Sequence, residues 1–266
     1  MWSAILSPDF FTTILRSATP ILFATLAAAI AAKAGICNMA LEGIMLFSAL
    51  FGVIFSSITH SAWLGLLITM VLGGLIGMIL AFFILNLKTD EILAAIAINL
   101  TATGGTVLLL VAFSGDRGVS SSIRSVSAPS VVIPFVEKIP FIGSILSGQN
   151  VLTWLSILAV ILLHLFLYKT PLGLAIRAVG ENKNAAESVG ISSRKIQYIA
   201  LIISGVLAAM GGFYLSGGYM NMFTKDMAGG RGFIALAAAS MGGNTPIGGF
   251  LVSLLFGIAQ AVANVM

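Results

Sequence analysis

Four polar side chains lie in segments that are otherwise apolar. Glu42 follows Asn38 by four residues and Thr103 follows Asn99 by four, so each pair shares one face of a helix. A charged group inside a bilayer costs about 3 kcal/mol or more, so Glu42 needs a partner. It either pairs with Lys33 or accepts hydrogen bonds from backbone N–H groups at the start of its own helix, unless it faces a polar pathway. The second pair either bonds to a neighbouring helix or lines a pore.

The remaining reactive side chains form no catalytic or metal-binding pattern. The chain has two histidines and one cysteine, and the H-x-x-x-H and C-x-x-C spacings of metal sites are absent from its sequence. The phosphate-cradling pattern G-x-x-x-x-G-K-[ST] is absent as well. Asp90 and Glu91 are adjacent, so they do not share a helix face, and we interpret them as capping groups rather than a catalytic pair. We expect no cofactor, no metal and no covalent chemistry in this chain.

The composition predicts an integral membrane protein. Of the 266 residues, 59% are hydrophobic and 8% are charged, and the mean hydropathy is +1.10. A soluble domain has about 25% charged residues. The net charge of +4 is carried by segments that flank the apolar runs, so it does not predict a nucleic-acid-binding surface.

The apolar runs predict an all-α bundle of about seven membrane spans in a single domain over residues 1–266. A span needs about 20 mostly apolar residues. The runs that qualify are 9–32, two between Glu42 and Lys88 that separate at 56–61, 92–113, 151–168, 196–219 and a last run after 250. The stretch GFIALAAASMGG, which begins at Gly232, is short and bounded by glycines. It predicts a half-helix that enters and leaves the membrane on one side.

The basic residues predict which loops are cytoplasmic. If 169–195 is cytoplasmic, seven basic residues lie inside and five outside, which places the N-terminus outside. The region 115–150 is then the one sizeable extracellular loop, which either caps the outer mouth or receives a protein partner. In this topology Glu42 lies near a membrane face. Residues 232–266 carry no charge, so we expect the natural chain to continue beyond residue 266.

A polar island, RAVGENKNAAESVGIS at 177–192, interrupts the apolar sequence. Gly180 and Gly190 bracket nine residues that predict a short helix over 181–189. On a helical wheel, one side of this helix carries mostly small side chains, and they are Asn182, Ala185, Ala186 and Val189. Such a helix either rests in the headgroup layer or inserts into a groove on another protein. Small residues favour the groove, because an interfacial anchor needs Trp, Phe or Leu.

Four stretches resemble one family of membrane proteins. The island, followed by SGVLAAMGG at 204–212, resembles the cytoplasmic coupling loop of ABC-transporter permeases in the group that includes the branched-chain amino acid and ribose permeases. GICNMALEGIM at 35–45 resembles the motif G-V-x-N-I-x-x-E-G of the subgroup that imports nucleosides, with Ile36 and Met39 as the differences. TDEILAAIAINL at 89–100 and GFIALAAASMGGNTPIGG at 232–249 resemble two further segments of that subgroup.

The resemblance implies a multi-pass permease subunit of the bacterial plasma membrane that forms half of the channel of an ATP-driven nucleoside importer. Its implied partners are a second permease in a heterodimer, an ABC ATPase and an extracellular substrate-binding lipoprotein. The alternatives are a sugar or branched-chain amino acid ABC permease, an ion-coupled secondary transporter, and a membrane scaffold that transports nothing.

The polar island and the polar residues inside the spans supply two sets of candidate functional residues. The helix that couples the chain to the ATPase would consist of Glu181, Asn182, Ala185, Ala186, Val189 and Gly190. The candidate translocation pathway would include Asn38, Glu42, Asn99 and Thr103. There Asn38 and Glu42 would either hydrogen-bond ribose hydroxyls or hold a broken helix beside the pathway.

Overall fold

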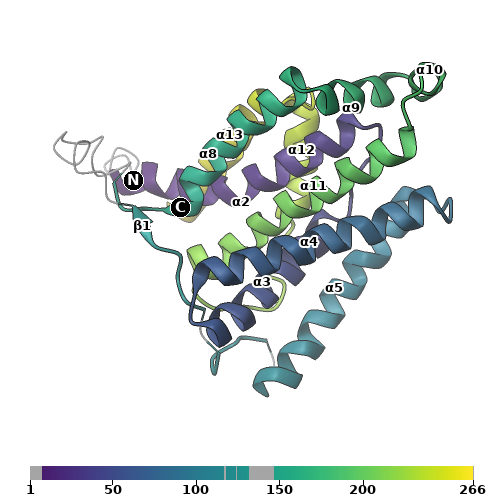
Figure 1. Ribbon diagram of the computed structural model, residues 1–266. Helices are drawn as coiled ribbons and strands as arrows, with labels where there is room; N and C mark the ends of the chain where they lie inside the picture. Colours follow the sequence, from purple (N-terminus) through teal and green to yellow (C-terminus); the bar gives the residue numbers. More distant parts are fainter. Residues whose placement is uncertain (1–7, 117, 124, 132–146, 266) are drawn as a thin grey trace.

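The protein is a bundle of long helices (Figure 1). The computed structural model describes residues 8–116, 118–123, 125–131 and 147–265. Within these ranges, seven helices are long and apolar enough to cross a membrane, which confirms the predicted all-α membrane bundle. They are α2 (Pro8–Lys33), α3 (Leu41–Thr59), α4 (Ala62–Leu85), α5 (Glu91–Ser114), α8 (Val151–Lys169), α11 (Ser193–Phe213) continued by the π-helix η1 (Tyr214–Tyr219), and α13 (Pro246–Val265).

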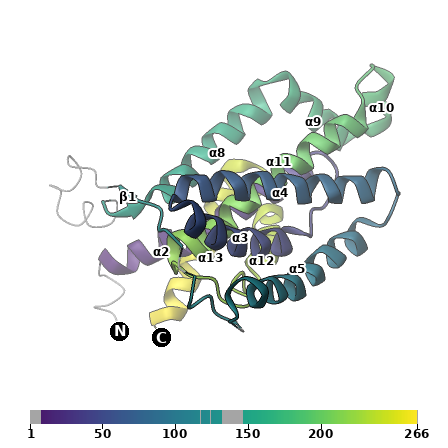
Figure 2. The same cartoon turned by 60° about the horizontal axis from the view of Figure 1, so that its bottom comes forward.

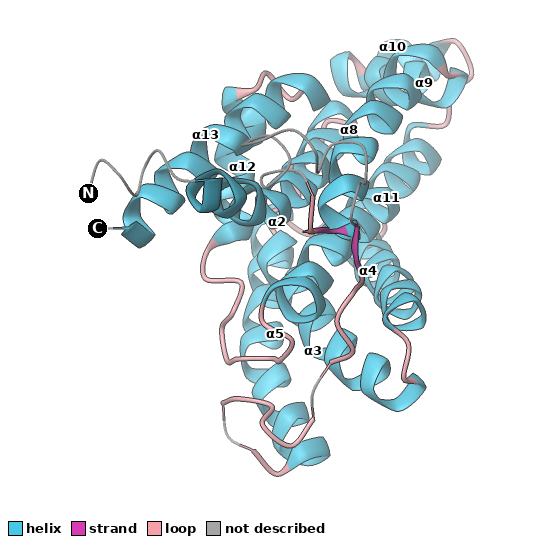
Figure 3. Ribbon diagram, turned by 90° about the vertical axis from the view of Figure 1, so that its left-hand side faces the viewer, coloured by secondary structure: helices cyan, strands magenta, loops and turns pink. Residues whose placement is uncertain are grey.

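The shorter elements lie between these spans. The short helices are α9 (Pro171–Glu181), α10 (Lys183–Ser188) and α12 (Arg231–Met241). The strands β1 (Ser130–Val131) and β2 (Gln149–Asn150) form a small antiparallel pair, drawn in magenta in Figure 3.

Polar caps fix several helix starts. Asp90 Oδ1 accepts hydrogen bonds from Ile92 N at 2.9 Å and Leu93 N at 3.1 Å, so this residue has the capping role predicted for it.

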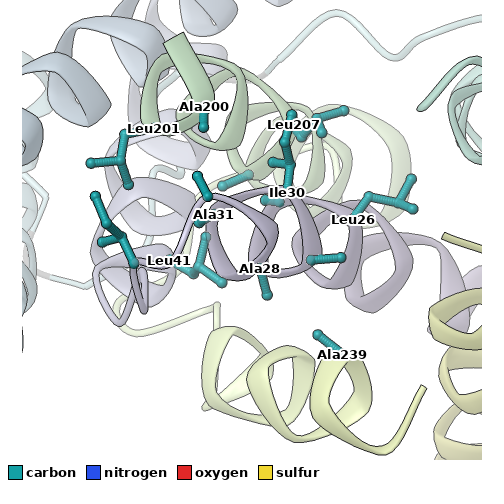
Figure 4. Packing of buried hydrophobic residues seen from close by; sticks show 14 of the residues in the cluster. Leu26, Ala28, Ile30, Ala31, Leu41, Ala200, Leu201, Leu207 and Ala239 are labelled. Carbon is teal, nitrogen blue, oxygen red and sulfur yellow. The ribbon is translucent and has the colours of Figure 1, made fainter. Parts of the chain in front are cut away.

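Helix α2 lies at the centre of the bundle. Every side chain from Ser17 to Ala31 is buried, because α11, α12, α13 and α8 all pack against it. Many of the contacting side chains are alanines, which let the helices approach closely. In Figure 4, Ala28 of α2 faces Ala239 of α12, while Ile30 points toward Leu207 of α11.

The peripheral helices keep apolar side chains on their outer faces. On α5, Leu93, Leu100 and Leu108 are each more than two-thirds exposed. An exposed apolar face of this kind is unfavourable in water but is matched to the hydrocarbon core of a bilayer. The outer faces of α5 and the other peripheral helices therefore suit contact with lipid or with another membrane subunit.

The predicted half-helix is present as α12, but it does not return to the side from which the chain enters. Arg231 lines a small void with Pro20, near the midpoint of α2, whereas Ala239 faces Ala28, nearer the end of α2 (Figure 4). Gly257 of α13 packs against Ala18. Helix α12 thus points toward the end of the molecule at which α2 ends, and α13 runs back along α2 in the opposite direction, so the prediction of a re-entrant element is wrong.

The segment before α12 explains this difference. Residues 220–230 are not helical. The first of them pair with the loop after α5, since Ser120 N donates to the carbonyl oxygen of Phe223 and Lys225 N donates to that of Gly118, and the buried residues Met227 and Ala228 then lead inward to the start of α12. Irregular backbone is tolerated at this depth because protein surrounds it. As a consequence, α13 ends beside the start of α2, and both lie at the opposite end of the molecule from α10 (Figures 1 and 2).

Glycines bring the backbones of α4 and α11 into direct contact. A Cβ on Gly73 would overlap the carbonyl oxygen of Gly205, and a Cβ on Gly205 would overlap the carbonyl oxygen of Gly73. One turn further along, a Cβ on Gly77 would overlap the carbonyl oxygen of Leu201. These glycines are therefore required for close helix packing rather than for a turn.

We expect Gly205→Ala to destabilise the protein by about 1–3 kcal/mol, because the added methyl group forces the two backbones apart. The measurement is the apparent Tm in detergent. The matched control is Gly104→Ala in α5, where no atom lies within 4 Å of the new Cβ. Alanine favours a helix over glycine, so the control should melt at or above the wild-type temperature. An equal loss of Tm in both variants would contradict the contact.

Candidate functional site

The turn between α2 and α3, residues 34–40, folds back into the bundle. Asn38 is 1% exposed; its Nδ2 donates to Ser204 Oγ at 2.8 Å, and its Oδ1 accepts from Ala40 N at 3.1 Å. Ser204 Oγ in turn donates to the carbonyl oxygen of Ala27 at 2.7 Å. Because Ala27 and Ser204 lie well inside α2 and α11, these bonds draw the turn inward, and α3 begins within the bundle.

Glu42 holds the start of α12. Its Oε1 accepts a hydrogen bond from Gly230 N, and its Oε2 accepts one from Gly232 N, each at 2.7 Å. The carboxylate is 7% exposed. Charge-assisted bonds of this kind are stronger than neutral ones, and the positive end of a helix dipole favours an anion. Glu42 therefore caps a helix far away in the sequence, and neither Lys33 nor the start of its own helix is its partner.

The depth of Glu42 also differs from the expectation. Arg231, which lies between the two glycines that Glu42 binds, shares a small void with Pro20 near the midpoint of α2. Glu42 is consequently near the middle of the bundle, and its predicted position near a membrane face is wrong. The reason is the turn 34–40, which carries the start of α3 inward.

Two glycines make this contact possible. Gly230 has φ +80°, a left-handed conformation that L side chains rarely adopt. A Cβ on Gly232 would lie 2.8 Å from Glu42 Oε2, so a larger residue would push the carboxylate away. The sequence Gly229-Gly230-Arg231-Gly232 was a signal for close backbone approach, and sequence reasoning did not use it.

Asn99 of α5 completes the same junction, and Thr103 does not join it. Asn99 Oδ1 accepts from Gly43 N at 2.8 Å, and Asn99 Nδ2 donates to the carbonyl oxygen of Met39 at 2.9 Å. The Thr103 hydroxyl donates to the carbonyl oxygen of Asn99 at 3.0 Å, within its own helix, and its side chain is exposed. Three of the four predicted pathway residues thus meet around the start of α3.

Cys37 and Glu91 link this turn to the start of α5. Cys37 N donates to Glu91 Oε2 at 3.0 Å. Burial, and then the negative charge of Glu91, raise the pKa of the Cys37 thiol above its usual range, so the thiol is uncharged at neutral pH and a poor nucleophile. Among the described residues, no three His, Cys, Asp or Glu side chains gather as a metal site requires.

The polar island forms two helices rather than one. Helix α9 continues to Glu181, the chain breaks at Asn182, and α10 follows. Asn182 Oδ1 caps α10 by accepting from Ala185 N at 3.0 Å. Gly180 lies inside α9, where a Cβ would overlap the carbonyl oxygen of Lys33. The predicted helix over 181–189 therefore starts too early, whereas Gly190, at φ +84°, follows the end of α10 as the predicted stop signal.

The residues predicted to form a stripe of small side chains differ in burial, so they do not form one surface. Ala186 is 4% exposed and packs into the core of the chain. Val189 is 76% exposed. The other predicted coupling residues are exposed as well, and they are Glu181, Asn182, Ala185 and Gly190. An exposed valine among small and polar residues is available for contact with another protein.

Two cavities lie away from the polar island. A polar cavity of about 690 Å³ opens near the start of α8 and the end of η1, and its lining includes Arg16, Asn150, Tyr214 and Tyr219. The described part of the predicted extracellular loop runs along it, since Ala128 N donates to the carbonyl oxygen of Gly217 at 2.9 Å. The rest of that loop, 132–146, lies outside the described residues.

The second cavity is an apolar groove of about 460 Å³ between α3, α4 and α5. Phe47 and Phe51 of α3 line it together with Thr101 of α5. The rings of Phe47 and Phe51 are 6.4 Å apart, and those of Phe51 and Phe55 are 5.9 Å apart, each pair nearly parallel. The aromatic rings of Phe47 and Phe51 therefore form part of the groove wall.

Comparisons with known proteins agree over almost the whole chain. Residues 10–266 match the family described as "Branched-chain amino acid transport system / permease component". The nucleoside ABC transporter permease protein NupC of Lactococcus lactis subsp. cremoris is 34% identical over 256 residues, which is 93% of this chain and 79% of that protein. The guanosine ABC transporter permease protein NupQ of Bacillus subtilis is 33% identical over 92% of this chain and 79% of its own length.

A third relative has a different named substrate. A putative glucose ABC transporter permease protein of Haloferax volcanii is 31% identical over 93% of this chain and 74% of its own length. No solved structure matches the chain significantly.

We expect Glu42→Gln to destabilise the protein by about 1–3 kcal/mol, because the amide nitrogen would face a backbone N–H that then lacks an acceptor. The apparent Tm in detergent measures this loss. Glu181→Gln is the matched control, since it removes the same charge from an exposed position and should leave Tm unchanged. A Glu42→Gln variant that melts with the wild type would show that the two bonds do not hold α12.

Proposed function

This chain belongs to the family of permease components of branched-chain amino acid transport systems, and we propose that it forms half of the channel of an ATP-driven importer of nucleosides. Seven apolar helices make it a multi-pass membrane protein. The observation that carries the proposal is the sequence similarity to two permease proteins, one named for nucleosides and one for guanosine. In both cases the aligned region covers more than nine-tenths of this chain. Proteins of this family are transport subunits rather than enzymes.

The proposed assembly contains three partners in a bacterial plasma membrane. A second, similar permease would form the other half of the channel, and a substrate-binding lipoprotein would deliver the nucleoside to the outer end. The sequence has no phosphate-cradling motif, so an ABC ATPase would supply the energy. We place its docking site on α10, around Ala185 and Val189, because these two residues of the polar island are exposed.

We propose that movement at α10 reaches the channel through the turn 34–40. Gly180 at the end of α9 packs against the backbone of Lys33 and Gly35, and Gln197 Nε2 donates to the carbonyl oxygen of Ala34 at 3.1 Å. The same turn carries Asn38, which is bonded to α11, and it leads directly into Glu42, which is bonded to the start of α12. A displacement of α9 would thus act on α11 and α12 through a continuous chain of contacts.

The polar residues at the start of α3 would shape the pathway rather than bind the substrate. Asn38, Glu42 and Asn99 use their polar atoms on the protein's own backbone and on Ser204. Thr103 has an exposed hydroxyl, and the nearby groove offers the rings of Phe47 and Phe51. Aromatic faces stack well on planar bases, so we place the nucleobase route along this side of α3 and α5.

Sugar import is the second candidate, because one similar protein is named as a putative glucose permease. Hydroxyl-bearing side chains such as Thr103 suit a sugar as well as a ribose. An ion-coupled secondary transporter is not favoured, because the similar proteins are named as ABC permeases.

Uptake of labelled guanosine and adenosine by cells with and without this chain tests the proposed substrate. We expect deletion to abolish the ATP-dependent part of uptake, whereas a protonophore should leave that part intact if cellular ATP is maintained. Loss of glucose uptake with unchanged nucleoside uptake would support the second candidate instead. Uptake that a protonophore abolishes while cellular ATP is maintained would overturn the ATP-driven mechanism.

Val189→Asp tests the proposed docking site on α10. Val189 is 76% exposed, so the variant should fold and insert normally. Burying an unpaired charge in the proposed interface should lower ATP-dependent uptake by roughly tenfold or more and weaken copurification of the ATPase. The matched variant Val189→Ile keeps the apolar surface and should behave as the wild type. Full uptake by the aspartate variant would exclude this surface.

A further inference from the structure

A third cavity, of about 300 Å³, lies at the inner end of the molecule, where α2 and α8 end and α9 begins. It lies at the same end as α10, and Figure 1 shows α8, α9 and α10 in succession along one edge of the molecule. The groups that line it are Lys33, Tyr168, Leu174, Arg177, Ala178 and Glu181. The proposed docking surface on α10 does not include this cavity.

The lining carries two cations against one carboxylate. Lys33 is the last residue of α2, and Arg177 comes from α9. The Arg177 guanidinium carbon lies 4.7 Å from the centre of the Tyr168 ring, and Arg177 Nε donates to the carbonyl oxygen of Leu167 at 3.0 Å. These contacts with α8 hold the guanidinium in place, so the cavity presents a fixed cation and a second, flexible one to an anion.

An apolar stripe leads from this cavity along the outer face of α8. Four residues that are each about half exposed follow the spacing i, i+3, i+4 and i+7, and they are Leu158, Ile161, Leu162 and Leu165. On α9, Leu172 and Leu174 beside the cavity are also exposed, Leu174 by 60%. The cationic cavity and the stripe together have the layout of a phospholipid, with a charged head at the membrane surface and chains below it.

We propose that this cavity binds the phosphate of an anionic phospholipid of the cytoplasmic leaflet, with the acyl chains along the α8 stripe. The cytoplasmic leaflet is rich in anionic headgroups, and basic pockets between helices on this side suit them. A free phosphate would use the two cations but not the stripe, and a soluble protein would not reach down α8. The bound lipid would bridge α2, α8 and α9, and so would fix the helix that leads into α10.

Lipid titration of the purified chain in neutral detergent, followed by native mass spectrometry, tests this site. We expect phosphatidylglycerol to bind the wild type more tightly than phosphatidylcholine does. Lys33→Gln should lower the affinity of the chain for phosphatidylglycerol about fivefold, which is the contribution of one cation near an anionic surface. Lys33→Arg should restore binding. Lys33 approaches Gly180 of α9 through its backbone, which these substitutions leave in place, so the variants should keep the Tm of the lipid-free chain.

Lys169→Gln is the matched control, because Lys169 ends α8 at the same level, is exposed and does not line the cavity. Its affinity for phosphatidylglycerol should equal that of the wild type. Equal weakening by both glutamine variants would indicate general surface charge and overturn the site. Equal binding of the two lipids would overturn it as well. Displacement of the lipid by millimolar inorganic phosphate would assign the cavity to a soluble anion instead.

Discussion

Backbone N–H groups in the middle of a membrane must find acceptors within the protein, because no water is there to replace them. The start of α12 creates this demand inside the bundle, where the N–H groups of Gly230 and Gly232 lie beside the start of α3. Glu42 meets it with both carboxylate oxygens. The cost of placing a carboxylate at this depth is offset because the groups it binds would otherwise remain unpaired. The position of α12, and the broken crossing it completes, depend on this one side chain.

The amide side chains around Glu42 serve the same purpose. Asn38, Asn99 and Gln197 each bond to backbone or hydroxyl groups of another element. Together they tie the turn 34–40 to α5 and α11, and Gly180 brings α9 against the same turn. The turn is therefore one place at which α9 meets the central helices, beside the direct packing of α9 on α11. A motion of α9 that reaches α3 and α12 through the turn must carry these bonds with it or break them.

The spans could be predicted from the sequence, because the hydropathy of each run and the glycine, proline or polar breaks between runs are local properties. The partner of Glu42 could not, since it lies 188 residues away and hydropathy says nothing about which helices meet. The direction of α12 depends on the path of residues 220–230. Because these residues form no helix, their sequence has no periodic hydrophobic pattern from which the path could be predicted. Similarly, the predicted helix over 181–189 ignored Asn182, whose cap separates α9 from α10.

Hydrogen–deuterium exchange at the start of α12 tests the central role of Glu42 most directly. The measurement follows the amides of Gly230 and Gly232 in the purified chain, with the same chain unfolded in denaturant as the reference for unprotected backbone. Bonds to a buried carboxylate predict that both amides exchange about as slowly as amides in the interior of α12. Exchange of both amides as fast as in the unfolded reference would contradict the account, because the start of α12 would then be open to water.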